Sequence, residues 1–267
     1  MRPPSASPWL RLPRRDPSPR VRLLCLPYAG SGVLTYHGWS RALPDGIEVC
    51  PLQLPGRDNR IQEQPFTAAE PLVEAAGSAL AAELTVPVAL FGHSMGAILA
   101  FELAHWFRRE LGVEPVRLFV SAADPPERRL LRERIHDLPE PDFLARLGEL
   151  GGTPHAILAQ PELRELLLPA LRADFALCDA YRYRERQPLA CPITVFGGTA
   201  DPLVDPTQLG GWARQTHGRC DVVILPGGHF FLAAEARADL LRTIGAELES
   251  DASPAVGPVG RATGNRW

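Results

Sequence analysis

The sequence has no long hydrophobic run, which limits the ways in which it can meet a membrane. Arg, Asp, Glu or Pro interrupts every apolar stretch before it reaches the roughly 18 residues of a membrane-spanning helix. The first 20 residues are rich in Pro, Ser and Arg, and they lack the apolar stretch of roughly 7 to 15 residues that signal peptides contain. We therefore expect a cytoplasmic protein that does not enter a membrane.

Cysteine pairs and an excess of positive charge are also missing. The cysteines are odd in number, widely spaced and without a C-x-x-C pair, so neither a disulfide framework nor a zinc site is predicted. They are Cys25, Cys50, Cys178, Cys191 and Cys220. A net charge of -3 gives no basic field, so nucleic acid and anionic membranes are not expected partners. We expect no metal and no cofactor.

Short apolar runs alternate with longer helical patterns along most of the chain. A length of 267 residues with 45% hydrophobic residues is enough for one large core. Almost continuously apolar runs are typical of strands buried on both faces, and they occupy residues 21–27, 47–55, 86–93, 116–123, 192–198 and 221–228. Helical patterns occupy residues 67–84, 96–111, 207–216 and 234–249. This alternation predicts an α/β protein with a mostly parallel, doubly wound sheet.

Three stretches depart from this alternation. Residues 1–20 and 251–267 are rich in Pro, Gly, Ala or Ser without a hydrophobic period, so we expect disordered tails around a domain of residues 21–250. Residues 124–187 look wholly helical and separate two strands. We interpret them as a helical lid over the carboxyl edge of the sheet, enclosing a substrate channel, with an ordinary structural insertion as the alternative.

A serine stands at the centre of a G-x-S-x-G pattern, between an apolar run and a helical pattern. In that context the motif forms a strained strand-to-helix turn, which lifts the Ser94 hydroxyl above the sheet. The helix that begins near Met95 points free N–H groups toward developing negative charge. Ser94 is therefore the predicted nucleophile, and His93 inside the turn is interpreted as structural.

A serine hydroxyl is a weak nucleophile at neutral pH and needs a histidine to accept its proton. His229 follows the last apolar run, where the chain order Ser, acid, His that accompanies this motif places the base. The acid that orients the imidazole is predicted to be Asp201, which follows the run 192–198. Asp205 and Asp124 remain alternatives for that acid.

Acyl transfer also needs two N–H donors for the oxyanion of its tetrahedral intermediate. One is predicted to be the backbone N–H of Met95, next to the nucleophile, and the other that of Ala29 in the glycine-rich loop after the first strand. A phosphate-binding loop is the alternative interpretation of residues 27–32, but both G-x-G-x-x-G and the P-loop lysine are absent there.

Several motifs together resemble those of type II thioesterases, which are α/β-hydrolases that accompany modular polyketide synthases and nonribosomal peptide synthetases. The resemblance covers residues 21–249 and is carried by LPYAGSG (26–32), PLQLPGRDNR (51–60), FGHSMGAILAFELA (91–104), LGGTP (150–154), LRADFALCDAYRY (171–183), GGTADPLV (197–204) and PGGHFFL (226–232). The chain is similar, more distantly, to the thioesterase of animal fatty-acid synthesis.

The resemblance implies an editing enzyme that removes aberrant or stalled acyl groups from the phosphopantetheine arm of acyl or peptidyl carrier domains. It implies the triad Ser94, Asp201 and His229, with Ala29 and Met95 as oxyanion donors. We expect a monomer, since nothing in the sequence requires more than one chain. One departure from the family pattern is Ser31, where a second glycine is usual; we expect this serine to narrow the site beside the thioester.

Carrier domains are usually acidic around their pantetheine serine, so basic side chains near the channel mouth should help docking. The candidate docking arginines are Arg57, Arg60, Arg128, Arg129, Arg132 and Arg134. Ordinary solvated arginines are the alternative interpretation. Two other functions also remain open, namely a general carboxylesterase that acts on free esters and a non-catalytic scaffold bound to synthase modules.

Overall fold

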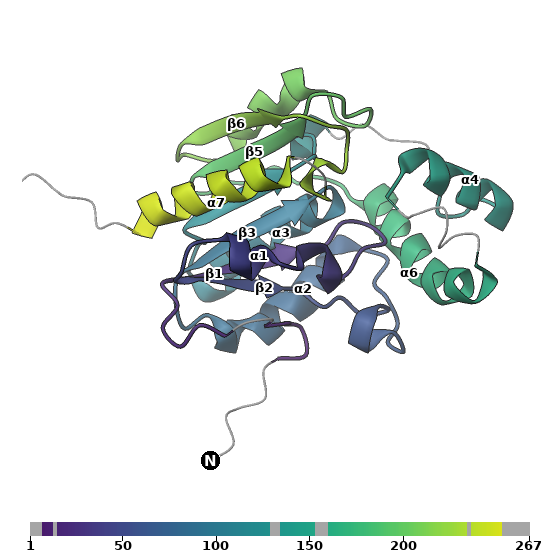
Figure 1. Ribbon diagram of the computed structural model, residues 1–267, viewed down its shortest axis with the longest axis horizontal. Coiled ribbons are helices and arrows are strands. Elements are labelled where there is room, and N and C mark those ends of the chain that lie inside the picture. The colour runs from purple at the N-terminus through teal and green to yellow at the C-terminus, as the bar shows by residue number, and fades with distance from the viewer. Residues whose placement is uncertain (1–6, 13–14, 129–133, 153–159, 234–235, 253–267) are drawn as a thin grey trace, which may run out of the picture.

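Six parallel strands form one sheet in the computed structural model, which describes residues 7–12, 15–128, 134–152, 160–233 and 236–252 (Figure 1). The strands are β1 (Val21–Leu26), β2 (Ile47–Pro51), β3 (Val88–His93), β4 (Arg117–Ser121), β5 (Ile193–Gly198) and β6 (Cys220–Leu225). Their order across the sheet is β2-β1-β3-β4-β5-β6, and all neighbouring strands are parallel. All six predicted strands are present, and the predicted doubly wound α/β fold is confirmed.

Helices cover both faces of this sheet. The longer ones are α2 (Ala69–Leu80) and α3 (Met95–Trp106), whose apolar residues belong to one core, and α7 (Arg237–Ala252), which shares the second core with α1 (Trp39–Ala42). Figure 1 shows α7 in front of the sheet. Short helical turns complete the connections: η1 (Val33–Tyr36), η2 (Asp58–Arg60), η3 (Ala81–Glu83), η4 (Phe107–Leu111), η5 (Pro126–Arg128), η6 (Pro206–Gln215) and η7 (Phe231–Ala233).

The central strands are apolar at most positions because their side chains point alternately into two cores. In β1, Leu24 and Leu26 pack with α2 and α3, whereas Leu23 and Cys25 pack with the residues around α7. Edge strand β6 differs, since its Val222 and Ile224 are 41% and 43% exposed. The prediction of a fully buried strand is therefore wrong for the edge strand β6, whereas the other edge strand, β2, is buried at every position.

The opposite edge of the sheet is covered by the N-terminal segment. Trp9 and Leu10 are buried, and Leu10 forms an antiparallel bridge with Leu52, just beyond β2. Further along, the Asp16 carboxylate accepts a hydrogen bond from the Gly46 N–H. The prediction that residues 1–20 form a disordered tail is therefore wrong for the described residues 7–12 and 15–20. Asp251, predicted to begin the other tail, belongs to α7, and residues 253–267 lie outside the described part of the chain.

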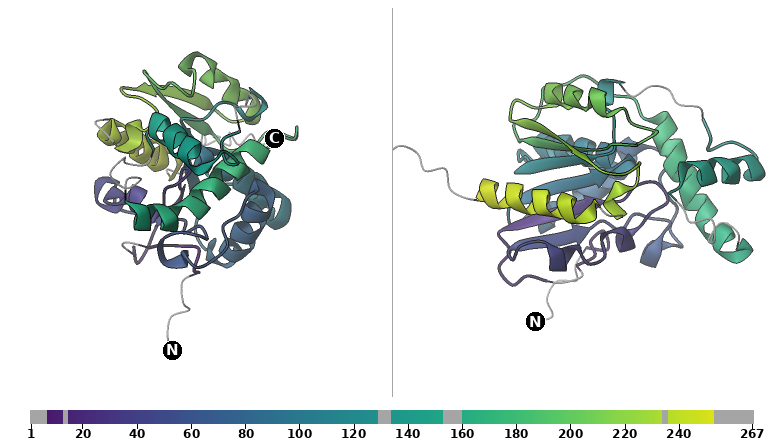
Figure 2. Two further views of the ribbon diagram at one scale, coloured as in Figure 1. Left: turned by 90° about the vertical axis from the view of Figure 1, so that its right-hand side faces the viewer. Right: turned by 45° about the horizontal axis from the view of Figure 1, so that its top comes forward.

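Two helices of the predicted lid region, α4 (Glu140–Leu150) and α6 (Pro161–Ala180), lie beyond the end of the sheet (Figure 2). They share a small core of their own, formed by Ile135, Phe143, Leu147 and Leu171, so the lid packs internally as well as onto the sheet domain. Among the described residues, no helix has the length and the apolar character needed to cross a membrane.

The buried His105 on α3 makes the stability of the fold depend on pH. Burial, and then the charges of Arg186 and Arg108, lower its pKa from 6.5 to about 3. The unfolded chain therefore binds a proton here below about pH 6.5 that the folded protein does not bind until about pH 3, so the free energy of unfolding falls as the pH falls through that window.

We expect His105→Gln to weaken this pH dependence. Between pH 7 and pH 5 the free energy of unfolding of His105→Gln should fall by about 1 to 2 kcal/mol less than that of the wild type, as urea unfolding measures. His217 is exposed, so His217→Gln is the matched control and should behave as the wild type does. An unchanged pH dependence in His105→Gln would contradict the prediction.

Candidate active site

Ser94 occupies a strained turn between β3 and α3. Its φ and ψ angles are 54° and −114°, a conformation that residues with a Cβ adopt at a cost. The Ser94 N–H donates to the Ser121 carbonyl of the neighbouring strand β4 over 2.8 Å, which ties the turn to the sheet. The serine is thus held at the carboxyl edge of the sheet, as its motif predicts.

The glycines of the motif are required by contact between backbones. A Cβ at Gly92 would lie 2.0 Å from the carbonyl oxygen of Gly96. A Cβ at Gly96 would lie 2.2 Å from the carbonyl oxygen of Leu26 in β1. Since no real Cβ approaches an oxygen so closely, larger residues at either position would push α3 away from the sheet and misplace Ser94.

His229 and Asp201 complete a hydrogen-bonded chain that begins at Ser94. His229 Nε2 lies 3.0 Å from Ser94 Oγ, and His229 Nδ1 lies 2.8 Å from Asp201 Oδ2. A carboxylate only accepts hydrogen bonds, so Nδ1 carries the proton and Nε2 is free to accept the serine proton. The Asp201 side chain is fully buried, and its Oδ1 accepts from the N–H groups of Leu203 and Val204.

The two alternative acids lie elsewhere. Asp205 accepts from the Thr207 N–H over 2.9 Å at the start of η6, so its carboxylate caps that helix. Asp124 lines a small cavity beside Ser94. Of the three aspartates predicted for this role, the structure places Asp201 against His229.

His93 lies behind His229 and is fully buried. Its Nδ1 is 2.9 Å from Ser121 Oγ, and its ring centroid is 5.3 Å from that of His229. Burial, followed by the proximity of His229, lowers the pKa of His93 well below its usual value. A neutral His93 leaves the imidazole of His229 without a competing positive charge behind it. The sequence predicts a structural role for His93 but does not indicate this contact with His229.

The predicted oxyanion donors flank Ser94. Met95 is the first residue of α3, where backbone N–H groups have no intrahelical acceptor. Ala29 follows β1 and lines the same cavity as Ser94 and His229. Among the described residues, neither the Ala29 N–H nor the Met95 N–H has a protein acceptor. Both donors are therefore available for an oxyanion formed beside Ser94.

A cavity of about 830 Å³ opens over Ser94 and His229 and lies between the sheet domain and the lid. Tyr28 and Phe230 line it from the sheet side. The apolar lining from the lid consists of Ile135, Leu147, Leu150, Leu171 and Phe175. The mostly apolar wall also carries charges of both signs, positive at Arg134, Arg146 and Arg182 and negative at Glu127 and Asp179. Such a chamber fits a long ligand with a polar or anionic end.

Phe230 lies between the lid and the catalytic base His229. No role was predicted for this residue from the sequence. Its ring contacts that of His229 at a centroid distance of 5.0 Å and that of Tyr28 at 5.1 Å. From the lid, Gly152 approaches the same ring so closely that a Cβ there would lie 2.7 Å from it. The glycine pair in LGGTP was a signal for this close approach.

Two expectations near the site are wrong. The Ser31 hydroxyl donates to the Tyr28 carbonyl over 2.8 Å and does not line the large cavity, so it closes its own turn and does not narrow the site. Arg57 is only 6% exposed and pairs with Asp174, so it is no docking residue. The Arg60 side chain binds Glu63 and covers the ring of Trp9.

Of the other candidate docking residues, Arg128 and Arg134 are exposed. Arg129 and Arg132 lie outside the described residues. The exposed pair therefore carries what remains of the predicted docking face.

The strain at Ser94 is measurable. Glycine tolerates a positive φ and alanine does not, so Ser94→Gly should have a larger free energy of unfolding than Ser94→Ala by about 1 kcal/mol in urea. Ser78, which is exposed within α2, is the matched control, and the order of stability should be reversed there. The free energy of unfolding of Ser78→Ala should exceed that of Ser78→Gly by about 1 kcal/mol. Equal stability of the two Ser94 variants would contradict strain at this turn.

Comparison with known proteins agrees with this geometry. The family model of the thioesterase domain matches residues 21–248. The gramicidin S biosynthesis protein GrsT of Aneurinibacillus migulanus is 43% identical over 213 residues, which cover 80% of this chain and 83% of that protein. Two solved structures are also similar to this chain. The first is RedJ, a thioesterase from the prodiginine biosynthetic pathway in Streptomyces coelicolor, with a TM-score of 0.80 and 38% identity over 90% of this chain and 93% of that one.

The second is the type II thioesterase BorB from the borrelidin biosynthetic cluster. It has a TM-score of 0.83 and 37% identity, and the match covers 91% of this chain and 98% of that one. The resemblance to type II thioesterases inferred from the motifs is thereby confirmed. The chain belongs to the thioesterase family and has the α/β-hydrolase fold.

Proposed function

We propose that this chain is an editing thioesterase, which hydrolyses aberrant or stalled acyl groups from the phosphopantetheine arm of carrier domains in polyketide or nonribosomal peptide synthesis. The hydrogen-bonded chain from Ser94 through His229 to Asp201, facing a large lid-covered chamber, is the observation that carries the proposal. The names of the relatives support the setting, since GrsT belongs to gramicidin S biosynthesis and BorB to the borrelidin cluster.

The proposed reaction uses a covalent acyl-enzyme. Ser94 Oγ attacks the thioester carbonyl carbon while its proton passes to His229 Nε2, and Asp201 stabilises the imidazolium that forms. The N–H groups of Ala29 and Met95 hold the oxyanion. The C–S bond then breaks, and the pantetheine sulfur leaves as a thiol with the proton from His229. A water molecule, deprotonated by His229, attacks the acyl carbonyl, and the free acid departs from Ser94. No cofactor takes part in these steps.

The chamber suits a pantetheine thioester better than a compact free ester. Its volume of about 830 Å³ is near the upper end for small-molecule sites, and a second cavity of about 40 Å³ adjoins Ser94 on the side of Met95. The apolar lid residues Leu147, Leu171 and Phe175 would pack along the arm. The arginines of the lining would face its phosphate.

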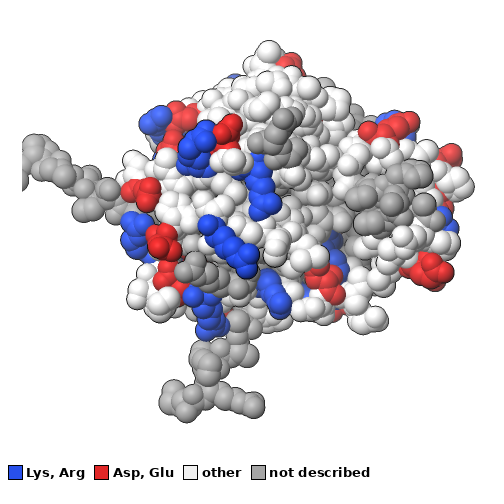
Figure 3. Space-filling view, in the orientation of Figure 1, with Lys and Arg blue, Asp and Glu red and all other residues white. Residues whose placement is uncertain are grey.

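A carrier domain is the proposed partner, docking at the mouth of the chamber. Arg134 is exposed and lines the chamber, which makes it the best-placed of the predicted docking arginines. On the face seen in Figure 3, positive side chains are scattered among negative and uncharged ones, so this face offers no single basic patch. All residues of the proposed reaction come from one chain, so a monomer suffices. We propose that it works in the cytoplasm beside its synthase.

Hydrolysis of a propionyl-loaded carrier protein tests the proposal directly. We expect the wild type to release propionate and Ser94→Ala to lose at least about 10³-fold in kcat, because the nucleophile is gone. Propionate release, followed by mass spectrometry of the carrier protein, should be measured in parallel with the cleavage of p-nitrophenyl esters.

The alternative functions give different results in the same assay. Cleavage of p-nitrophenyl esters without release from the carrier would make the chain a general esterase. No cleavage of either substrate, together with undiminished product yield in cells carrying Ser94→Ala, would make it a scaffold.

A further inference from the structure

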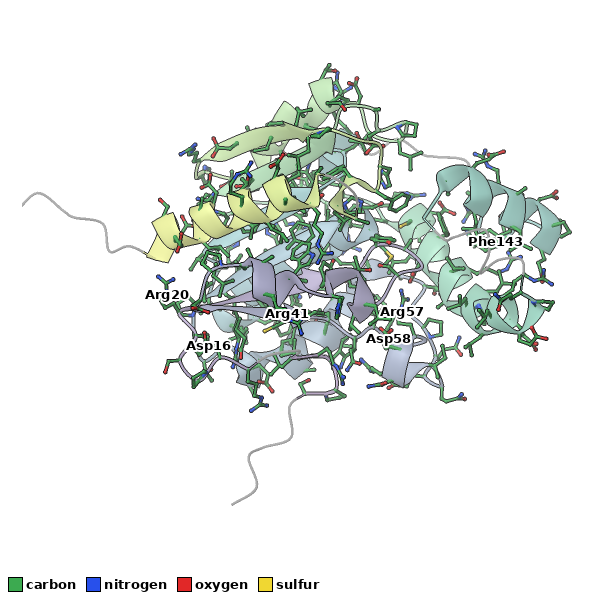
Figure 4. The ribbon with its side chains drawn as sticks, in the orientation of Figure 1. Asp16, Arg20, Arg41, Arg57, Asp58 and Phe143 are labelled. Carbon is green, nitrogen blue, oxygen red and sulfur yellow. The ribbon has the colours of Figure 1, made fainter. Side chains whose placement is uncertain are left out.

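A buried ion pair joins the lid to the loop that contains Ala29. Arg57 Nη2 lies 2.7 Å from Asp174 Oδ1, and Arg57 Nη1 lies 2.8 Å from Asp174 Oδ2. The side chains are 7% and 2% exposed. Arg57 follows β2, whereas Asp174 lies in the lid helix α6, and Figure 4 shows Arg57 where the sheet domain meets the lid. Such a pair costs desolvation, so good geometry and additional hydrogen bonds must offset that cost.

The additional hydrogen bonds go to consecutive residues of one loop. The Gly30 N–H donates to Asp174 Oδ2 over 2.8 Å. Arg57 Nη1 donates to the carbonyl oxygen of Ser31 over 2.9 Å. Asp174 and Arg57 therefore both bind the segment that directly follows Ala29, Asp174 through the Gly30 N–H and Arg57 through the Ser31 carbonyl.

Asp58 holds the far end of the same loop. Its Oδ2 accepts from the Val33 N–H over 3.0 Å, and its own backbone has a positive φ of 49°. The carboxylate lies so close to Gly32 that a Cβ there would be 2.3 Å from Oδ2. Within the loop, the Ser31 N–H donates to the Tyr28 carbonyl over 2.9 Å. The residues on both sides of Ala29 are thus held in place: Tyr28 before it, and the segment from Gly30 to Val33 after it.

Helix α6 has two tasks on neighbouring turns. Leu171 and Cys178 line the chamber, whereas Asp174, three residues after the first and four before the second, binds the loop. Neither Arg57 nor Asp174 is among the residues that line the chamber. They therefore do not contact a ligand in it, and any effect on the reaction must pass through the loop.

We propose that Arg57 and Asp174 are positioning residues for the oxyanion hole, which hold the Ala29 N–H in position. Because Asp174 belongs to the lid helix α6, the position of this N–H depends on how α6 packs against the loop. The inference rests on the role proposed above for Ala29. A small displacement of a donor lowers the stabilisation of the transition state while substrate binding is largely kept, because the oxyanion exists only after attack has begun.

Asp174→Asn is the main test, since the amide keeps the shape of the side chain and removes its charge. With a propionyl-loaded carrier protein we expect kcat to fall about 10- to 100-fold while KM changes by about 2-fold or less. An alkyl boronic acid, which forms a tetrahedral adduct on Ser94, should lose affinity by the same factor as kcat. The dissociation constant of the intact acyl-carrier protein should be the same for the double variant Ser94→Ala/Asp174→Asn as for Ser94→Ala alone.

A second, partly buried ion pair supplies the matched control. Arg117 begins β4, at the opposite end of the sheet from the site, and its guanidinium donates to the Asp251 carboxylate over 2.7 and 2.9 Å. Asp251→Asn should lower the melting temperature but leave kcat and boronate affinity unchanged. The double variant Arg57→Met with Asp174→Leu replaces the pair by apolar groups, which should preserve folding without restoring kcat.

Two results would overturn the inference. One is a folded Asp174→Asn or Arg57→Met/Asp174→Leu protein with wild-type kcat, which would show that the pair contributes to stability only. The other is a lower kcat without a parallel loss of boronate affinity. If the wild type acts on p-nitrophenyl esters alone, the proposed function fails, but the same variants measured on that ester still test the positioning, since both reactions need the oxyanion hole.

Discussion

A sheet of parallel strands buried on both faces is the constraint on which the rest of this protein depends. Parallel neighbours cannot be joined by tight hairpins, so each connection crosses a face of the sheet, and the carboxyl ends of all strands meet at one edge. Ala29 follows β1, Ser94 follows β3, Asp201 follows β5 and His229 follows β6. Residues far apart in the chain therefore meet at this edge, and the lid closes over it.

At that edge, stability is given up in favour of geometry. Ser94 has a strained backbone, His93 is buried and neutral, and Arg57 and Asp174 are buried charges. Close backbone packing at the motif glycines and hydrogen bonds to the loop after β1 hold these groups in place. The result is a rigid set of donors and acceptors on the sheet side of the chamber, opposite a lid with a small core of its own.

Predictions from the sequence are wrong where a residue's surroundings come from distant parts of the chain. Arg57 resembles any surface arginine, yet its partner Asp174 is 117 residues away. Trp9 stands in a Pro- and Arg-rich segment without a hydrophobic period, but it is buried because Arg60 and Phe66 pack against its ring. β6 has the apolar composition of a central strand, but it lies at an edge of the sheet and exposes Val222 and Ile224, whereas the N-terminal segment covers the other edge strand, β2.

The sequence by itself determined the order of strands and helices, the strained turn at Ser94 and the choice of His229, because these follow from local sterics, hydrophobic period and chain order. It left Asp201, Asp205 and Asp124 open as acids, and the tertiary structure selected Asp201 by placing its carboxylate 2.8 Å from His229. The sequence predicted a lid over a substrate channel, but the tertiary structure alone decided which residues line the chamber, the burial of Arg57 and the contact of α6 with the loop after Ala29. Each of these depends on contacts between segments that are distant in sequence, and no local pattern determines which distant segments pack against each other.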